Sequence, residues 1–311
     1  MVRQETAAVD EAARLLGDRA RRDVPIGPLT TYRVGGRAAL FLDAADEDDL
    51  WLARDAVRSS GVATLLVGNG SNLLVADGGF AGLAVHLGPA FDRGDWDDQP
   101  RLWAGAAASL PVLARQSAAA GLTGFEWAVG VPGSIGGAVR MNAGGHGSDM
   151  AAVVGRYRVI DLAGPDDASG TFAPDRLGYG YRHSTVTPHQ VVVGARLDLA
   201  EGDAERSKAA IAEIVRWRRE HQPGGQNAGS VFTNPTGDSA GRLIEAAGAM
   251  GLRLGTAQVS TKHANFIQAD PGGSADDVLA LIHVVRRIVA DHGGVELATE
   301  LRLVGFGDEA Q

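Results

Sequence analysis

Glycine is concentrated in a few short stretches of this chain, and those stretches limit the possible folds most strongly. Of the 311 residues, 43 are glycine, nearly twice the usual share of about 7%. The densest stretches are Gly68–Asn72 (GNGSN) and Gly130–Gly137 (GVPGSIGG), and more glycines follow up to Gly147. Glycine lets backbone N–H groups approach a phosphate closely. One such stretch alone is more often a tight turn, but two favour a dinucleotide with a diphosphate.

The glycine stretches do not match the two common nucleotide-binding motifs. Gly68 and Gly70 begin a GxGxxG spacing, but Leu73 stands where the third glycine belongs. No Gly-Lys-Ser or Gly-Lys-Thr follows any glycine run, as a P-loop requires. A bound nucleotide therefore needs a fold other than the Rossmann or P-loop fold.

Composition indicates an ordinary globular protein, with 45% hydrophobic and 22% charged residues. At about 150 residues per domain, the length predicts two domains. There is no apolar run of membrane-spanning length and no signal peptide, and 29 basic against 38 acidic residues give a net charge of −9. This charge disfavours nucleic-acid and membrane partners. The chain has no cysteine, which excludes disulfides and thiolate chemistry and predicts a cytoplasmic location, and its 8 scattered histidines predict no metal site.

Hydrophobic periodicity predicts an α+β fold. After a helix in residues 1–22, the pattern reads as a strand–helix–strand unit whose last strand runs into the first glycine stretch. A polar loop at 90–101 suits a subdomain boundary. The expected elements are strands at 39–42, 63–67, 83–87, 156–162, 191–199 and 300–304, and helices at 45–60, 204–219, 239–247 and from Ser274, with Ser274 and Asp277 as a capping box.

Four polar clusters are ordinary when each is taken alone. Ser230 in AGSVFTNP lacks the GxSxG pattern of a hydrolase and is typical of a turn. Arg182 beside Tyr181 is typical of a surface arginine stacked on a ring. The segment 261–266 is typical of a loop, and Glu300 and Arg302 of a salt-bridged strand edge.

Taken together and in order, these strings resemble the UDP-N-acetylenolpyruvoylglucosamine reductase (MurB) family of flavoenzymes. The resemblance covers roughly residues 28–305. Its strings are TTYRVGG at 30–36, GNGSNLLV at 68–75, GVPGSIGGAVRMNAG at 130–144, GYRHS at 180–184, AGSVFTNP at 228–235, DSAGRLIEAAG at 238–248, AQVSTKHANFI at 257–267 and Glu300-Leu301-Arg302.

The resemblance implies an N-terminal helical segment (1–27), a PCMH-type FAD-binding domain (28–200) with two subdomains split near 90–101, and a C-terminal α+β substrate-binding domain (201–311). It implies NADPH-dependent, FAD-mediated reduction of a UDP-sugar enol ether, UDP-N-acetylglucosamine-enolpyruvate, to UDP-N-acetylmuramate in peptidoglycan precursor synthesis. Competing hypotheses are a PCMH-type oxidase of an alcohol or amine, and a sugar-nucleotide sensor that has lost its flavin.

The resemblance also implies roles for particular residues. The catalytic residues would be Arg182, which binds the substrate carboxylate, Ser230, which donates a proton, and Glu300. The cofactor-binding residues would be Gly68, Asn69, Gly70, Ser71, Asn72, Gly130, Pro132, Gly133, Ser134, Gly136, Gly137 and Asn142. The substrate-binding residues would be Tyr181, Asn234, Lys262, His263 and Arg302.

The sequence departs from the family pattern at three positions. Thr233 stands where the family often has lysine, His183 where an acidic residue is common, and Asn69 where many members have glycine. Only 47 residues lie between Arg182 and Ser230, which resembles the family subtype without an inserted tyrosine-bearing loop. No such loop is therefore expected to cap the substrate.

Overall fold

The computed structural model describes residues 2–96 and 100–307. Met1, residues 97–99 of the predicted loop at 90–101, and residues 308–311 of the predicted C-terminal domain lie outside the described residues. The chain divides into two compact units that each draw on several segments. Unit 1 is Met1–Arg22, Leu40–Asn69 and Ala81–Arg218, and unit 2 is Asp23–Ala39, Gly70–Phe80 and Arg219–Gln311. The domain boundaries after residues 27 and 200 stay predictions.

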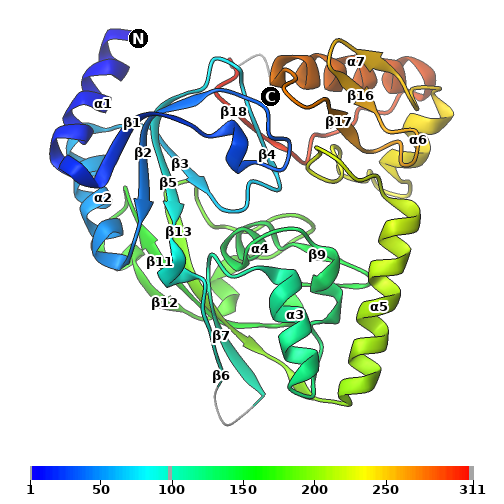
Figure 1. Ribbon diagram of the computed structural model, residues 1–311, viewed down its shortest axis with the longest axis horizontal. Coiled ribbons are helices and arrows are strands. Elements are labelled where there is room, and N and C mark those ends of the chain that lie inside the picture. Colours follow the sequence, from blue (N-terminus) through cyan, green and yellow to red (C-terminus); the bar gives the residue numbers. More distant parts are fainter. Residues whose placement is uncertain (1, 97–99, 308–311) are drawn as a thin grey trace. The chain divides into compact units, whose positions relative to one another are not determined.

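The main sheet of unit 1 has five strands in the order β12-β11-β13-β7-β6 (Figure 1). Each pair of neighbours is antiparallel. The helix α4 (Ile135–Met141) packs against β13 and β7. The strands are β6 (Gly94–Trp96), β7 (Arg101–Gly105), β11 (Val154–Asp161), β12 (Gly170–Phe172) and β13 (Gln190–Asp198).

A second sheet has the order β1-β2-β5-β3, with β3 parallel to β5. Its strands are β1 (Ala20–Pro25), β2 (Arg37–Ala44), β3 (Thr64–Val67) and β5 (Phe80–Leu87). The helix α2 (Glu47–Ser60) connects β2 to β3 and packs against α1 (Val2–Leu16). Asp46 caps the start of α2 and Gly61 ends it at φ 67°, so the predicted stop at Gly61 is confirmed.

The remaining elements of unit 1 include two helices and two short pairs of strands. Helix α3 (Leu110–Ala119) packs on the turn at 126–130. Two short antiparallel pairs join β8 (Leu122–Thr123) to β14 (Ala200–Glu201) and β9 (Gly144–Gly145) to β10 (Ser148–Asp149). Helix α5 (Ala204–His221) follows and runs on into unit 2.

Unit 2 is built around α7 (Ala275–Gly293), which covers a three-stranded antiparallel sheet. The predicted apolar face is confirmed, because Val278, Leu281, Ile282, Val285 and Val289 are buried. Its other elements are β4 (Leu73–Val75), α6 (Ala240–Ala246), β15 (Arg253–Leu254), β16 (Ala257–Val259), β17 (Ile267–Ala269) and β18 (Arg302–Val304), which runs parallel to β4.

Three local predictions need correction. The helix predicted for 1–22 ends at Leu16, because the chain enters β1 at Ala20. Part of the predicted loop at 90–101 is β6, an arm of the hairpin with β7. The strand predicted for 300–304 begins only at Arg302.

The predicted capping box at α7 is half formed. Ser274 accepts a hydrogen bond from the Asp277 N–H as expected. The Asp277 carboxylate instead accepts from the N–H and hydroxyl of Thr256, and the Thr256 hydroxyl oxygen takes the Ser274 N–H. The reciprocal bond of a capping box is therefore replaced by a link from α7 to the turn before β16.

Candidate active site

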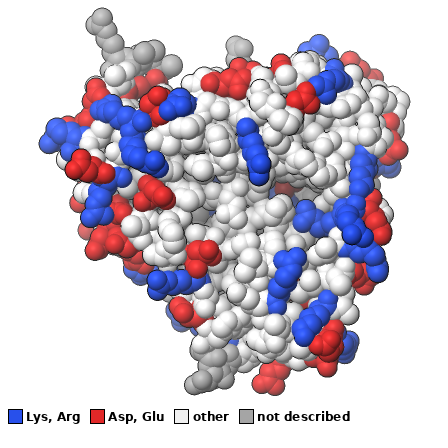
Figure 2. Space-filling model, viewed as in Figure 1, with Lys and Arg blue, Asp and Glu red and all other residues white. Residues whose placement is uncertain are grey.

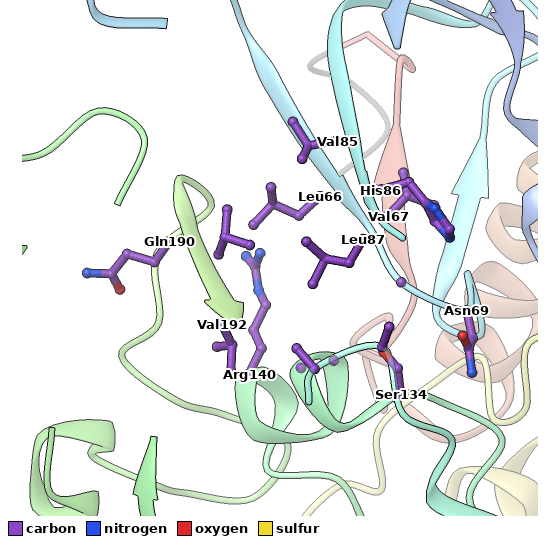
Figure 3. A pocket seen from close by; sticks show the side chains of 16 residues that line it. Leu66, Val67, Asn69, Val85, His86, Leu87, Ser134, Arg140, Gln190 and Val192 are labelled. Atoms are coloured by element: carbon purple, nitrogen blue, oxygen red, sulfur yellow. The ribbon is translucent and has the colours of Figure 1, made fainter. Parts of the chain in front are cut away.

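A pocket in unit 1 opens beside the first glycine stretch (Figure 3). It holds about 600 Å³ of space between atoms, part of which is open solvent. The aliphatic side chains of Leu66, Val85, Leu87 and Val192 line part of its wall, and its polar part includes Gly68, Asn69, Ser134, Gly136 and Gly137. Such a site suits a ligand that has both a flat apolar ring and polar groups.

The polar part of the pocket depends on Gly68 having no side chain. A Cβ atom at Gly68 would lie 2.8 Å from the Ser134 hydroxyl, too close for a carbon atom. Ser134 precedes α4 but does not cap it, whereas Ser239 and Ser274 cap their helices through their side chains. Glycine at position 68 thus makes room for the Ser134 hydroxyl, a polar group of the pocket that does not cap α4. A hydroxyl in this place fits a polar group of a cofactor such as FAD.

The second glycine stretch, Gly130–Gly137, lines part of the pocket and also lets neighbouring backbone segments pack closely. The N–H groups of Ile135 and Gly136 donate to the carbonyls of Ala108 and Ala106, so they are already used within the chain. A Cβ at Gly136 would lie 3.0 Å from the Ala106 Cβ, so glycine lets α4 lie close to the end of β7. Gly133 accepts from Leu110, Pro132 is exposed, and Gly130 lies against the ring of His146.

The first glycine stretch divides its residues between the units. Asn69 is exposed in the pocket wall of unit 1 and has no positive φ, so asparagine at this position costs no backbone strain. Gly70, at φ 59°, begins the part in unit 2, where Ser71 is half-buried. The Asn72 side chain donates to the Glu300 carbonyl at 3.1 Å, and the Asn72 carbonyl accepts from Arg302 at 2.9 Å. The side-chain amide of Asn72 is thus already hydrogen-bonded within the protein.

Arg182 occupies a tight turn in unit 1. Gly180 and His183 exchange backbone hydrogen bonds of 3.1 and 3.2 Å, which leaves Tyr181 and Arg182 at the tip. Arg182 has φ 53°, a left-handed conformation that favours glycine. Its guanidinium donates to the Gly144 carbonyl at 2.9 Å and lies 5.3 Å from the centre of the Tyr181 ring, whose residue is 61% exposed. The turn presents a permanent cation at a strained position.

Asn142 holds this turn in place. It ends α4 in a left-handed conformation and is buried, at 4% exposure. Its amide donates to the Gly180 carbonyl at 3.0 Å and to the Asp149 carboxylate at 3.1 Å, and it accepts from the Ala151 N–H at 2.9 Å. Because the chain already uses this side chain, any contact of Asn142 to a cofactor would come from its backbone.

Ser230 and Glu300 lie on adjacent segments of unit 2. The Glu300 N–H donates to the Val231 carbonyl at 2.8 Å, and the Thr233 N–H donates to the Ala298 carbonyl at 2.9 Å. Phe232 and Thr299 form a bridge between the two segments. This short ladder places the half-buried Ser230 and Glu300 at neighbouring ends of paired backbone, one residue apart in register.

Three of the predicted substrate-binding residues of unit 2 already form hydrogen bonds within the chain. The Asn234 oxygen accepts from Ala240 at the start of α6, and the Lys262 ammonium donates to the Arg219 carbonyl. His263 accepts from the Asn265 N–H, and burial lowers the pKa of its imidazole, which favours a neutral ring. Arg302 is exposed on β18. The Thr233 hydroxyl donates to the Ala298 carbonyl, so this position supplies no cation where the family often has lysine.

Two groups of side chains were not predicted from the sequence. Arg140 extends from α4 toward the aliphatic wall of the pocket, and Gln190 lines its other side (Figure 3). A basic residue inside GVPGSIGGAVR is a signal that could have found Arg140, but no local signal marks Gln190. Despite the net negative charge, Figure 2 shows Lys and Arg side chains gathered along one edge of the molecule. Helix α5 itself carries the exposed Arg206, Lys208 and Arg216.

Comparisons with known proteins show the family to which this chain belongs. Residues 38–165 match the family model of an FAD binding domain, which defines the chain as a flavoprotein with the pocket in its cofactor domain. Residues 221–304 match the family model of the UDP-N-acetylenolpyruvoylglucosamine reductase C-terminal domain.

Relatives extend the match over nearly the whole chain. A UDP-N-acetylenolpyruvoylglucosamine reductase of Heliobacterium modesticaldum is 44% identical over 90% of this chain and 89% of the relative, and one of Anaeromyxobacter sp. (strain K) is 41% identical over 96% and 90%. The crystal structure of the MurB enzyme from Thermus caldophilus superposes with a TM-score of 0.80 at 36% identity, over 92% of this chain and 99% of that one. The chain belongs to the UDP-N-acetylenolpyruvoylglucosamine reductase (MurB) family and is an oxidoreductase. The predicted α+β fold class and the predicted flavin are thereby confirmed.

Among the described residues, no helix is both long and apolar enough to cross a bilayer.

Proposed function

We propose that this chain uses NADPH to reduce the enolpyruvyl group of UDP-N-acetylglucosamine-enolpyruvate, giving UDP-N-acetylmuramate for peptidoglycan precursor synthesis. The observation that carries the proposal is the backbone ladder that joins residues 231–233 to residues 298–300 and so holds the segment that carries Ser230 beside the segment that carries Glu300. The cytoplasmic location, and the absence of nucleic-acid and membrane partners, stay predictions.

The pocket of unit 1 supplies the residues that would hold FAD. Gly68, Asn69, Ser134 and Gly137 line its polar part, while the aliphatic wall would cover apolar surface of the cofactor. When bound, FAD would supply the chemistry of hydride transfer between NADPH and the enolpyruvyl carbon that is remote from the carboxylate.

Arg182 makes the alkene a hydride acceptor. An enol ether accepts a hydride only if the adjacent carboxylate can absorb the developing negative charge. A guanidinium is permanently charged and binds a carboxylate through two N–H groups. One guanidinium nitrogen of Arg182 donates to the Gly144 carbonyl, and this bond orients the guanidinium plane.

Ser230 donates the proton that completes the reduction. A hydroxyl is a weak acid, so its position and the supply of a replacement proton decide its rate. Glu300, paired with Val231, positions this network or donates a hydrogen bond when its carboxyl group is protonated.

The test is the Ser230→Ala variant, measured by stopped-flow absorbance of the flavin. Bleaching by NADPH should stay within about twofold of wild type, while recolouring by the UDP-sugar enol ether should slow by about 10²-fold or more. Ser239→Ala is the matched control, since it removes another serine of unit 2 that caps α6, and it should slow neither step.

Three results would contradict the proposal. Equal slowing of both steps in Ser230→Ala would remove the serine from proton donation. Oxygen uptake on a small alcohol would favour the oxidase hypothesis, and a colourless protein that FAD does not reconstitute would favour the sensor hypothesis.

A further inference from the structure

Asn265 is a buried side chain to which neither the sequence analysis nor the proposed reaction gives a role. It lies in the segment between β16 and β17 and is only 3% exposed. Its amide group accepts from the Phe232 N–H at 2.9 Å and donates to the Phe232 carbonyl at 2.8 Å, and its backbone carbonyl accepts from the Val231 N–H at 2.9 Å. Three hydrogen bonds from this one residue therefore fall on the two residues that follow Ser230.

Through these bonds, Asn265 takes the position that a neighbouring strand would have beside residues 231 and 232. The carboxamide pairs with both backbone groups of Phe232, as a strand residue does in an antiparallel ladder. On its other side, the same segment pairs with residues 298–300 through the bonds to Glu300 and Ala298. The Ser230 segment is thus held from two sides, and on one of those sides the bonds come from a single residue, Asn265.

We propose that Asn265 is the positioning residue that sets the Ser230 hydroxyl for proton donation. This inference rests on the proposed function for the role of Ser230, but the geometry that supports it does not. Asn265 reaches Ser230 only through the backbone of Val231 and Phe232. A shift of about 1 Å in a reacting group can cost about 10²-fold in rate, so a loosened segment is expected to act on proton donation.

Asn265→Asp is the sharpest variant because its effect depends on protonation. A carboxylate keeps the acceptor for the Phe232 N–H but turns a negative oxygen toward the Phe232 carbonyl. A protonated carboxyl group has one donor and one acceptor, like the amide it replaces. Burial raises the pKa of a carboxyl group, so the variant should regain the native bonds as the pH is lowered.

The groups that titrate near this position are few and can be controlled. His263 accepts the Asn265 N–H through Nδ1, and Glu300 lies across the Val231 bond. Both are present in wild type, so the wild-type profile over the same pH range subtracts their contribution. Leu281→Ala trims the buried core of unit 2 on α7, the core in which Val231 and Phe232 also lie. It controls for a loss of stability because it removes none of the hydrogen bonds that Asn265 makes.

The experiment uses the FAD-loaded enzyme in stopped flow from pH 5.5 to 8.5. In Asn265→Asp at pH 8, recolouring by the enol ether should slow by about 10²-fold while bleaching by NADPH stays near wild type. The recolouring rate should recover as the pH falls, whereas wild type and Leu281→Ala should show no such recovery.

Three outcomes overturn the inference, and they differ from a failure of the proposed function. Equal slowing of both steps, no slowing, or slowing without recovery at low pH would show that Asn265 does not position Ser230 in this way. If Ser230→Ala itself spares recolouring, the proposed serine role fails first, and this inference fails with it.

Discussion

Two buried asparagines, one in each unit, support the proposed catalytic side chains by different means. Asn142 in unit 1 binds two separate segments through its side chain, one at Asp149 and Ala151 and the other at Gly180. Asn265 in unit 2 directs its side chain to a single residue, Phe232. Asn142 thus links loops to one another, whereas Asn265 forms the hydrogen bonds that a neighbouring strand would form.

The difference follows from the backbone that each asparagine supports. The turn at 180–183 holds Arg182 at φ 53°, a conformation that costs about 1–2 kcal/mol for a residue with a side chain. The segment at 231–233 is extended and is paired on both sides, so its backbone carries no such strain. A strained turn needs hydrogen bonds to more than one segment to keep its conformation, while an extended segment needs only a hydrogen-bonded partner along its length.

The largest expected effect is on Arg182. Arg182→Ala should slow recolouring of the flavin by the enol ether by about 10²–10³-fold, the cost of losing one strong charge-stabilising donor, and should leave bleaching by NADPH nearly unchanged. Arg115→Ala is the matched control, because Arg115 is also in unit 1 and donates its side chain to a backbone carbonyl, that of Pro111. Unchanged turnover in Arg182→Ala would remove Arg182 from the site.

A second variant compares the two asparagines directly. Asn142→Asp should destabilise the fold more than Asn265→Asp, because it puts a carboxylate where the amide donates to the Asp149 carboxylate at 3.1 Å. Urea unfolding of the two variants at pH 7 should show a loss of about 2–4 kcal/mol for Asn142→Asp, since two buried bonds are lost and like charges meet. If Asn265→Asp is the less stable of the two variants, the proposed difference between the structural roles of Asn142 and Asn265 is wrong.

The smallest effect tests the strain in the turn. Arg182→Gly and Arg182→Ala both remove the guanidinium, but only glycine adopts φ 53° without a steric penalty. The glycine variant should therefore unfold at higher urea, by about 1 kcal/mol in free energy. Equal stability of the two variants would show that the turn relaxes when the arginine is lost.

Local sequence signals predicted the elements that depend on nearby residues. Asp46 and Gly61 bound α2 as expected, and the apolar spacing from Val278 to Val289 is the buried face of α7. Both depend on contacts within a few turns of helix, which the sequence carries directly. The capping box at Ser274 was only half right because Asp277 reaches Thr256, 21 residues earlier in the chain.

The sequence by itself determined the family, the flavin and the identity of the chemical groups, because ordered strings of glycine, arginine, serine and glutamate are properties of the chain alone. Only the tertiary structure decided what the asparagines do. Asn72, Asn142 and Asn265 find their partners 228, 38 and 33 residues away, and an amide binds whichever backbone group folding brings to it. No local pattern specifies that partner, since each of these bonds forms only after distant segments have packed.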